Sequence, residues 1–200
     1  MEQYFTKNPT TQKEIYKFDW NLGKDRFYFY TSNSVFSKNG VDFGSMLLVE
    51  TVIKENANFK GNILDLGCGY GPIGVMLAKL IENANVTMSD VNERALELAK
   101  MNAEENKVKT RVKTLSSSAF DNINENFDMI VTNPPIRAGK DVVFSFYEGA
   151  YEHLNKGGHL YVVIQKKQGS PSTKEKLESL FGNCETAEKK SGYFIFRAEK

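Results

Sequence analysis

The strongest constraint on the fold is a regular alternation of short apolar runs with helical patterns from residue 62 to the C-terminus. Runs such as 62–66 and 127–133 are largely apolar, and segments with apolar residues at helical spacing separate them. Strands that are buried on both faces give such runs, whereas strands with one solvated face alternate apolar and polar residues. The chain is therefore predicted to form a mostly parallel sheet that helices cover on both faces.

The expected elements follow from these patterns. Five strands are predicted at 62–66, 85–90, 109–115, 127–133 and 157–165. Helices are predicted at 46–56, 72–82, 92–106, 141–154 and 172–181, with Asn92 as the N-cap of the third. The last two runs, 185–190 and 193–199, flank Ser191-Gly192 and are predicted to form an antiparallel pair. The sheet is thus expected to contain seven strands.

A small β-hairpin is expected ahead of this sheet. Segments 13–20 and 26–31 are rich in aromatic residues and flank Asn21-Leu22-Gly23, which is expected to form the turn. We therefore expect two parts in the chain. Residues 1–40 form a hairpin and substrate-side appendage that does not fold independently, and residues 41–200 form the main domain. This length suits one domain, since domains commonly contain about 100–200 residues.

Composition excludes several classes of protein. The net charge is +1, so a nucleic-acid partner would have to be bound by local basic patches rather than by overall charge. Two cysteines and two histidines lack metal-ligand spacing, so no metal is expected and free thiols fit a reducing cytoplasm. The first 16 residues are too polar for a signal peptide, and no apolar run reaches transmembrane length. We expect a soluble cytoplasmic protein without a membrane partner, and a monomer is favoured.

The loop after the first parallel strand reads DLGCGYGPIG, from Asp65 to Gly74, and contains two overlapping glycine patterns. Its second half matches the GxGxxG of dinucleotide-binding enzymes, and its first half is a DxGxGxG that suits another adenosine cofactor. Close glycines let the backbone turn tightly and approach a ligand, and the following helix offers free N–H groups. A tight turn without a ligand has the same glycines, so the loop alone leaves the cofactor open.

The charge of Asp65 favours S-adenosylmethionine. Beside a dinucleotide this carboxylate would face phosphate, and like charges about 4 Å apart repel by roughly 1–4 kcal/mol. S-adenosylmethionine instead carries a cationic amino group and a sulfonium. An Asp that caps the turn through backbone N–H groups is compatible with either cofactor. Asp90, roughly 20 residues beyond the glycines, is expected to bind ribose hydroxyls or to cap a helix, and Ser118 is expected near the adenine.

Asn133-Pro134-Pro135 follows the fourth parallel strand and indicates chemistry at an amino group. Two successive prolines end the strand and force a rigid, extended turn. A purely structural role in ending the strand would explain the two prolines but not the Asn that precedes them. An exocyclic amino group is a poor nucleophile, and the Asn133 side-chain oxygen with the Pro134 carbonyl would hold its two hydrogens and aim its lone pair. The same acceptors suit the positive charge that develops on nitrogen during methylation.

Five segments together resemble a known family: YFTKNP, SVFSKNGVDFGSMLLVET, ILDLGCGYGPIG, TNPPIRAGK and VVIQKKQG. The chain resembles class I S-adenosylmethionine-dependent methyltransferases of the methyltransferase small domain group, over nearly its whole length. Within that group it is similar to the small-subunit (16S) ribosomal RNA guanine-N2-methyltransferases of the C type. The resemblance implies a Rossmann-like doubly wound fold and methyl transfer to guanine N2 in 16S rRNA. Longer relatives carry a second, degenerate domain before the catalytic one, where this chain has a hairpin.

The resemblance also implies roles for individual residues. Asn133, Pro134 and Pro135 are expected to hold the target amino group. Ile136 stands where many amino-methyltransferases place an aromatic residue on the target base, and Phe36 is an alternative stacking side chain. The residues expected to bind the cofactor are Asp65, Gly67, Cys68, Gly69, Gly71, Asp90, Val91, Ser118, Ala119 and Asn133.

Four basic residues, Arg137, Lys140, Lys166 and Lys167, follow the fourth and fifth parallel strands and are expected to contact RNA phosphates. The target base must then be unpaired or flipped out. Two other readings stay open. The acceptor can be a protein glutamine amide or adenine N6, or the chain can be a non-catalytic or NAD-type nucleotide-binding protein. Asp65 and Asn133-Pro134-Pro135 disfavour the last of these.

Overall fold

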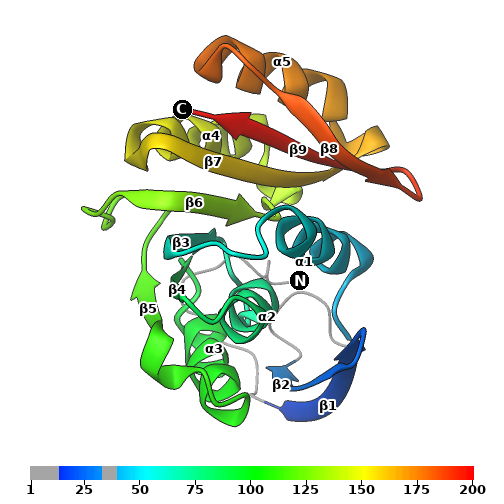
Figure 1. Ribbon diagram of the computed structural model, residues 1–200, viewed down its shortest axis with the longest axis vertical. Coiled ribbons are helices and arrows are strands. Elements are labelled where there is room, and N and C mark those ends of the chain that lie inside the picture. The colour runs from blue at the N-terminus through cyan, green and yellow to red at the C-terminus, as the bar shows by residue number, and fades with distance from the viewer. Residues whose placement is uncertain (1–13, 33–39) are drawn as a thin grey trace.

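The structure is a computed structural model and describes residues 14–32 and 40–200. Its centre is a seven-stranded sheet with the strand order β5-β4-β3-β6-β7-β9-β8 (Figure 1). Strands β3 to β7 pair in parallel, and β9 pairs antiparallel with β7 and β8. The predicted Rossmann-like doubly wound sheet with an antiparallel C-terminal pair is confirmed. The strands are β3 (Gly61–Leu66), β4 (Ala84–Asp90), β5 (Val112–Ser116), β6 (Phe127–Thr132), β7 (Leu154–Gln165), β8 (Glu185–Lys190) and β9 (Tyr193–Glu199).

Helices cover both faces of this sheet, and each face has its own apolar core (Figure 1). One core includes Leu48 and Met76 from the helices α1 and α2, and the other includes Tyr147 and Leu177 from α4 and α5. Burial on both faces explains why the parallel strands are largely apolar runs. The helices are α1 (Phe43–Glu55), α2 (Pro72–Leu80), α3 (Glu93–Glu105), α4 (Lys140–His153) and α5 (Ser170–Phe181), with short 3₁₀ turns η1 (Lys109–Arg111), η2 (Ile136–Ala138) and η3 (Lys166–Gln168).

The order of strands reverses between β3 and β6. Strands β4 and β5 lie on one side of β3, and β6 and β7 lie on the other. In sheets of this kind, ligands bind in the crevice outside the carboxyl ends of the strands at such a reversal. The hydroxyl of Thr132, at the end of β6, donates to the carbonyl oxygen of Leu66, at the end of β3, over 2.8 Å. This bond fixes the two strand ends that border the crevice.

Several expected boundaries needed correction: the strand expected at 157–165 already begins at Leu154, and three other cases have a local cause. The hairpin turn lies at Gly23-Lys24 rather than at Asn21-Leu22-Gly23, because Gly23 has a φ of +58° and the two preceding residues belong to a strand. Helix α1 begins at Phe43 rather than at residue 46, because the Asp42 side chain accepts from the backbone N–H of Ser45 and caps the helix there. The expected strand 109–115 starts only at Val112, after η1.

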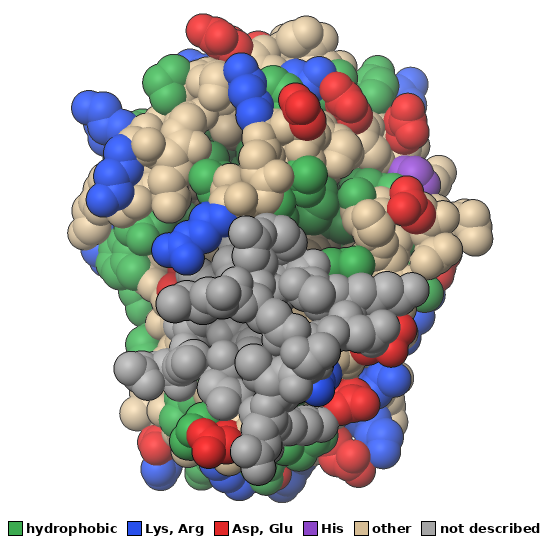
Figure 2. Space-filling model, turned by 180° about the vertical axis from the view of Figure 1, so that it is seen from behind, with side chains coloured by type: hydrophobic (Ala, Val, Ile, Leu, Met, Phe, Trp, Pro, Cys, Tyr) green, Lys and Arg blue, Asp and Glu red, His purple; other side chains and the backbone are tan. Residues whose placement is uncertain are grey.

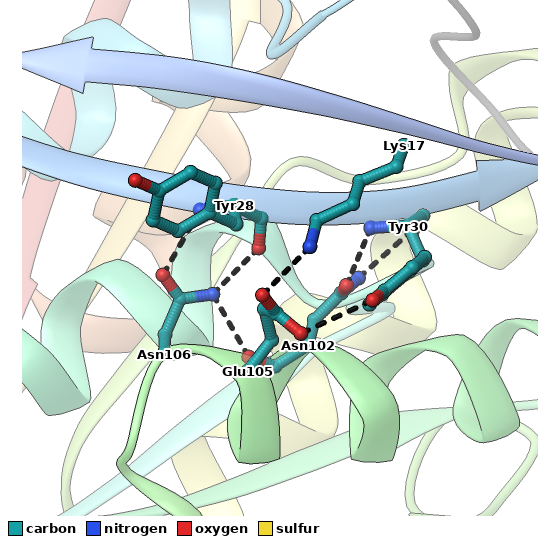
Figure 3. A network of polar contacts seen from close by, with 6 residues as sticks. All are labelled: Lys17, Tyr28, Tyr30, Asn102, Glu105 and Asn106. Carbon is teal, nitrogen blue, oxygen red and sulfur yellow. Dashed lines mark hydrogen bonds and ion pairs between the residues drawn. The ribbon is translucent and has the colours of Figure 1, made fainter.

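The expected N-terminal hairpin is present as β1 (Ile15–Leu22) and β2 (Asp25–Ser32), and two asparagines of α3 hold it in place (Figure 3). Asn102 accepts from the backbone N–H of Tyr30 at 2.6 Å and donates to its carbonyl at 2.9 Å. Asn106, one helical turn later, makes the same pair of contacts with Tyr28 at 3.1 and 2.7 Å. The two amides therefore pair with the outer edge of β2 much as a neighbouring strand would.

Within the described ranges, no helix is both long and apolar enough to cross a lipid bilayer. The division of the chain at residue 40 stays a prediction, although the hairpin does form a two-stranded sheet of its own.

Candidate functional site

A cavity of about 350 Å³ opens at the carboxyl ends of the central strands, where the strand order reverses. The glycine-rich loop after β3, the ends of β4 and β5, the Asn-Pro-Pro turn and the start of α1 all contribute to its wall. The predicted site residues that line it are Gly67, Cys68, Gly69, Asp90, Val91, Ser118, Ala119, Asn133, Pro134 and Pro135. Segments that are far apart in the sequence thus meet at one cavity, because the carboxyl ends of the parallel strands lie at the same edge of the sheet.

The glycines of the loop serve different purposes. Gly69 has a φ of +57°, and a Cβ atom added to it would meet nothing within 4 Å, so its surface is open to the cavity. At Gly71, a Cβ would lie 2.9 Å from the sulfur of Met88, and at Gly74 it would lie 2.6 Å from the Met88 Cγ. Gly74, the last glycine of the GxGxxG pattern, is therefore required for packing of α2 on β4.

Asp65 lies beneath this loop and does not line the cavity. Its side chain is 1% exposed, and its Oδ2 accepts from the backbone N–H of Gly74 at 2.8 Å. Its Oδ1 has no hydrogen-bond partner in the described part of the chain. Burial raises the pKa of Asp65 to about 7, the bond from Gly74 lowers it, and the charge of Asp90 raises it further. A buried, half-satisfied carboxyl group beside an open glycine loop fits a ligand that brings positive charge there.

Asp90 ends β4 and does line the cavity. Its Oδ2 accepts from the backbone N–H of Gly69 and its Oδ1 from that of Asn92, both at 2.8 Å. Burial raises the pKa of Asp90, although these N–H groups oppose the shift. Each carboxylate oxygen has a further lone pair, so Asp90 can accept from a ligand hydroxyl while it holds the glycine loop.

The wall beyond β5 is held by a serine that the sequence analysis did not single out. Ser117 is buried, donates through Oγ to the carbonyl of Ala119 at 2.9 Å and accepts from the N–H of Asn122 at 3.1 Å. These bonds fix a turn in which Ala119 has a φ of +45°, while Ser118 is exposed. The run of three serines at 116–118 gave no signal to distinguish them.

Asn133, directly after β6, is held by the start of α1. Its Nδ2 donates to Asp42 Oδ1 at 3.3 Å and to Ser45 Oγ at 3.0 Å. A carboxylate can only accept, so the amide must turn its nitrogen toward Asp42. Oδ1 has no hydrogen-bond partner among the described residues, and Asn133 lines the cavity. An amide oxygen that can accept a hydrogen bond therefore belongs to the same cavity as the glycine loop.

The two prolines give this acceptor a rigid neighbour. Pro135 has a φ of −75° and a ψ of 77°, which is an inverse γ-turn, and the Pro134 carbonyl accepts from the N–H of Ile136 at 2.9 Å. A carbonyl oxygen has two lone pairs, so Pro134 keeps one for a second donor.

Several predicted residues lie outside the cavity wall. Gly71 is covered by packing, and Ile136 packs against the core on the side of α4 and α5. On the side of the Asn-Pro-Pro turn, the apolar residues that line the cavity are Pro135, Ala138, Val142 and Phe146. Val142 is 40% exposed, which is unusual for a large apolar side chain in this molecule. Phe36 lies outside the described residues.

The predicted phosphate-binding residues, Arg137, Lys140, Lys166 and Lys167, are all exposed and lie just after β6 and β7. In the part of the chain that the structure describes, none of them forms an ion pair, whereas Lys113 and Lys176 pair with acidic side chains. Figure 2 shows the molecule from behind, with Lys and Arg side chains at the upper left and several acidic side chains at the upper right.

Comparisons with known proteins place residues 26–197 in the family described as methyltransferase small domain. The chain is 46% identical to the uncharacterized protein YbxB of Bacillus subtilis over 201 residues, which is 100% of this chain and 98% of that protein. It is 32% identical to ribosomal RNA small subunit methyltransferase C of Erwinia tasmaniensis, over 96% of this chain and 54% of that one. The structure of the T. thermophilus 16S rRNA N2 methyltransferase RsmC, in complex with AdoMet and guanosine, is 27% identical and superposes with a TM-score of 0.83.

The lengths of these relatives differ. The match to the T. thermophilus protein covers 96% of this chain and 52% of that protein. The chain therefore spans about half the length of the C-type relatives that it matches. It spans nearly all of the B. subtilis protein.

Proposed function

This chain belongs to the methyltransferase small domain family and is an S-adenosylmethionine-dependent methyltransferase, and we propose that it methylates N2 of a guanine in 16S ribosomal RNA. The observation that carries the proposal is the side-chain oxygen of Asn133, which has no hydrogen-bond partner among the described residues, in a residue that lines the same cavity as the open glycine loop. The matches to C-type ribosomal RNA methyltransferases support the choice of guanine N2 and of 16S rRNA. An acceptor of this kind also implies work in the cytoplasm.

The residues present fit S-adenosylmethionine. Gly67, Cys68 and Gly69 would hold the methionine end, above the buried carboxyl of Asp65. Asp90 would accept from the ribose hydroxyls, and the turn at 117–119 would border the adenine. When bound, S-adenosylmethionine supplies an electrophilic methyl group on its sulfonium. Because Gly71 and Asp65 do not line the cavity, we assign them to the support of this loop rather than to contact with the cofactor.

The catalytic task of this chain is to present the amino group. The lone pair of an exocyclic guanine amino group is delocalised into the ring, so the nitrogen is a weak nucleophile. The Asn133 Oδ1 and the second lone pair of the Pro134 carbonyl would bind its two hydrogens and fix its orientation. Both acceptors also stabilise the positive charge that develops on nitrogen as the methyl group transfers. The proton can leave to water afterwards, so no strong base is needed.

RNA would reach the cavity from the side of η2 and η3. Arg137, Lys140, Lys166 and Lys167, which are exposed, would contact its phosphates, and the target base would be flipped into the cavity. Because Ile136 is partly buried against the core and does not line the cavity, we propose that Val142 and Ala138 give the base its apolar contact.

The proposal is tested by offering labelled S-adenosylmethionine with undermodified small subunits, naked 16S rRNA, tRNA and total protein. We expect label in 16S rRNA and N2-methylguanosine after nucleoside analysis. Label in glutamine side chains or in N6-methyladenosine would replace the proposed acceptor by one of the alternatives. Titration with NAD and S-adenosylhomocysteine separates the cofactors, and binding of NAD alone would reject the assignment of the cavity.

A further inference from the structure

We propose that Asp42 is a positioning residue for methyl transfer, which acts with Ser45 through the Asn133 amide. This inference rests on the proposed function, because it explains how the acceptor at Asn133 is prepared. Both residues line the cavity, but this role acts through the amide and needs no contact with the target base or the cofactor. Each binds the nitrogen of the amide whose oxygen receives the amino group.

The contacts come from the first turn of α1, far from Asn133 in the sequence. Asp42 and Ser45 lie 91 and 88 residues before Asn133. They occupy both hydrogens of the Asn133 Nδ2, at 3.3 and 3.0 Å, so the amide is held against rotation about its terminal torsion. An amide that is free to flip would present N–H groups to the target for part of the time, and these repel an amino donor. Because the pair holds Nδ2, Oδ1 is the atom of the amide that is left to accept the target amino group.

The charge of Asp42 adds to this effect. An N–H group that donates to a carboxylate is polarised more strongly than one that donates to a neutral group. Electron density in the amide shifts toward its oxygen, and chains of hydrogen bonds strengthen one another in this way. Asn133 Oδ1 thereby becomes a better acceptor for a nitrogen that gains positive charge.

The start of α1 is itself firmly held. Asp42 Oδ1 accepts from the N–H of Ser45 at 3.1 Å, which caps the helix. The hydroxyl of Tyr70, from the glycine loop, donates to the carbonyl of Gly40 at 3.2 Å, two residues before Asp42. Ser45 is 3% exposed. The two acceptors for Asn133 thus stand on a rigid base that is joined to the cofactor loop.

The test separates the capping role of Asp42 from its role at Asn133. Serine is as good an N-cap as aspartate, but its shorter side chain does not reach Asn133, so Asp42→Ser keeps the helix and loses the contact. Asp42→Asn keeps an acceptor for both partners. We expect Asp42→Ser to lower kcat by up to about 100-fold, as misplacement of a reacting group does. Asp42→Asn should retain most of the activity, and Ser45→Ala, which leaves the cap intact, should lie between them.

The KM for RNA and the affinity for S-adenosylhomocysteine should stay within about twofold of wild type in all three variants, which corresponds to a few tenths of a kcal/mol. The thermal midpoint should stay close to that of wild type. Asp19→Ser, on the exposed face of the hairpin, is the matched control and should behave as wild type. Wild-type kcat in Asp42→Ser, or a loss confined to cofactor affinity, would overturn the inference. If Asp42→Ser does not fold, Ser45→Ala decides in the same way. A wild-type enzyme that methylates another acceptor rejects the proposed function only, because the same variants can be compared on that acceptor.

Discussion

The side-chain nitrogen of Asn102 lies 2.8 Å from the carbonyl oxygen of Tyr70 and donates a hydrogen bond to it. Asn102 is fully buried in α3, and Tyr70 belongs to the glycine loop. The same amide pairs with both backbone groups of Tyr30 in the hairpin (Figure 3). One side chain therefore joins the cofactor loop to the N-terminal hairpin.

Replacement of Asn102 by Ala should affect both parts at once. Three hydrogen bonds are lost and their partners are left without donors or acceptors, so we expect a loss of about 2–4 kcal/mol in the free energy of unfolding. Cofactor affinity should fall as well, because Tyr70 loses its anchor. Asn106→Ala is the control, since Asn106 binds the hairpin and its own helix but not the loop. Urea unfolding and calorimetric titration measure the two effects. Equal cofactor affinity in the two variants would contradict the role of Asn102 in holding the glycine loop.

Much of this arrangement was predictable because it is encoded locally. The apolar runs gave the strands, the glycine pattern gave the loop after β3, and the two prolines gave the turn at Asn133. Contacts between distant segments were not predictable in this way. Nothing near Asp42 indicates that it faces Asn133, and Asn102 and Asn106 resemble any two polar residues on a helix. Their spacing of four residues, which places them on one face, was the only available signal.

The direction of a side chain is a second feature that the sequence pattern does not contain. Asp65 was expected to face the cofactor. In the structure its side chain turns beneath the glycine loop, where it accepts from the N–H of Gly74, and it does not line the cavity. Ile136 follows the prolines directly, but the turn at Pro135 directs it into the core. Backbone geometry decided both cases, and one-dimensional patterns do not contain it.

Gly69→Ala and Gly74→Ala should give opposite phenotypes. Alanine at Gly69 should lower the free energy of unfolding by about 1–2 kcal/mol, because the backbone φ there is +57°. Its methyl group also enters the open cavity, so cofactor affinity should fall by about 10-fold or more. Alanine at Gly74 meets Met88 and should cost about 1–3 kcal/mol of stability with a smaller effect on affinity. Gly182→Ala, at a φ of +73° with no atom near its Cβ, measures the backbone strain alone. Wild-type cofactor affinity in Gly69→Ala would refute the assignment.

The buried carboxyl of Asp65 should make stability depend on pH. Its pKa is about 7 in the folded chain and about 4 in the unfolded chain, so the unfolded chain releases this proton first as the pH rises. The stabilising contribution is complete below pH 4 and is lost as the pH rises through 7. Asp65→Asn cannot ionise and still offers Gly74 an acceptor. Its stability relative to wild type should therefore increase between pH 4 and 7, by up to about 4 kcal/mol. Urea unfolding of both proteins across this range is the measurement, and parallel curves would contradict the prediction.

The basic residues after β7 should make RNA binding sensitive to salt. If Lys166 and Lys167 each neutralise a phosphate, the double Ala variant should weaken binding and reduce the slope of log affinity against log salt by about 1–2. Lys189→Ala/Lys190→Ala is a matched control, because this adjacent pair lies on β8 at the edge of the sheet. Filter binding at several salt concentrations gives the slopes. Identical slopes for the two double variants would show that Lys166 and Lys167 do not contact phosphates.

Val142 and Ile136 should separate contact with the target base from packing of the core. Val142 lines the cavity and is 40% exposed, so Val142→Ser removes an apolar contact for the base but little packing. About 1 kcal/mol of lost contact corresponds to a KM for RNA that is roughly fivefold higher, with the thermal midpoint almost unchanged. Ile136→Ala should instead lower stability by about 1–2 kcal/mol and leave this KM near its wild-type value, because the side chain packs against the core of α4 and α5. If Ile136→Ala raises the KM for RNA and Val142→Ser does not, the target base contacts Ile136, as the resemblance to amino-methyltransferases implied.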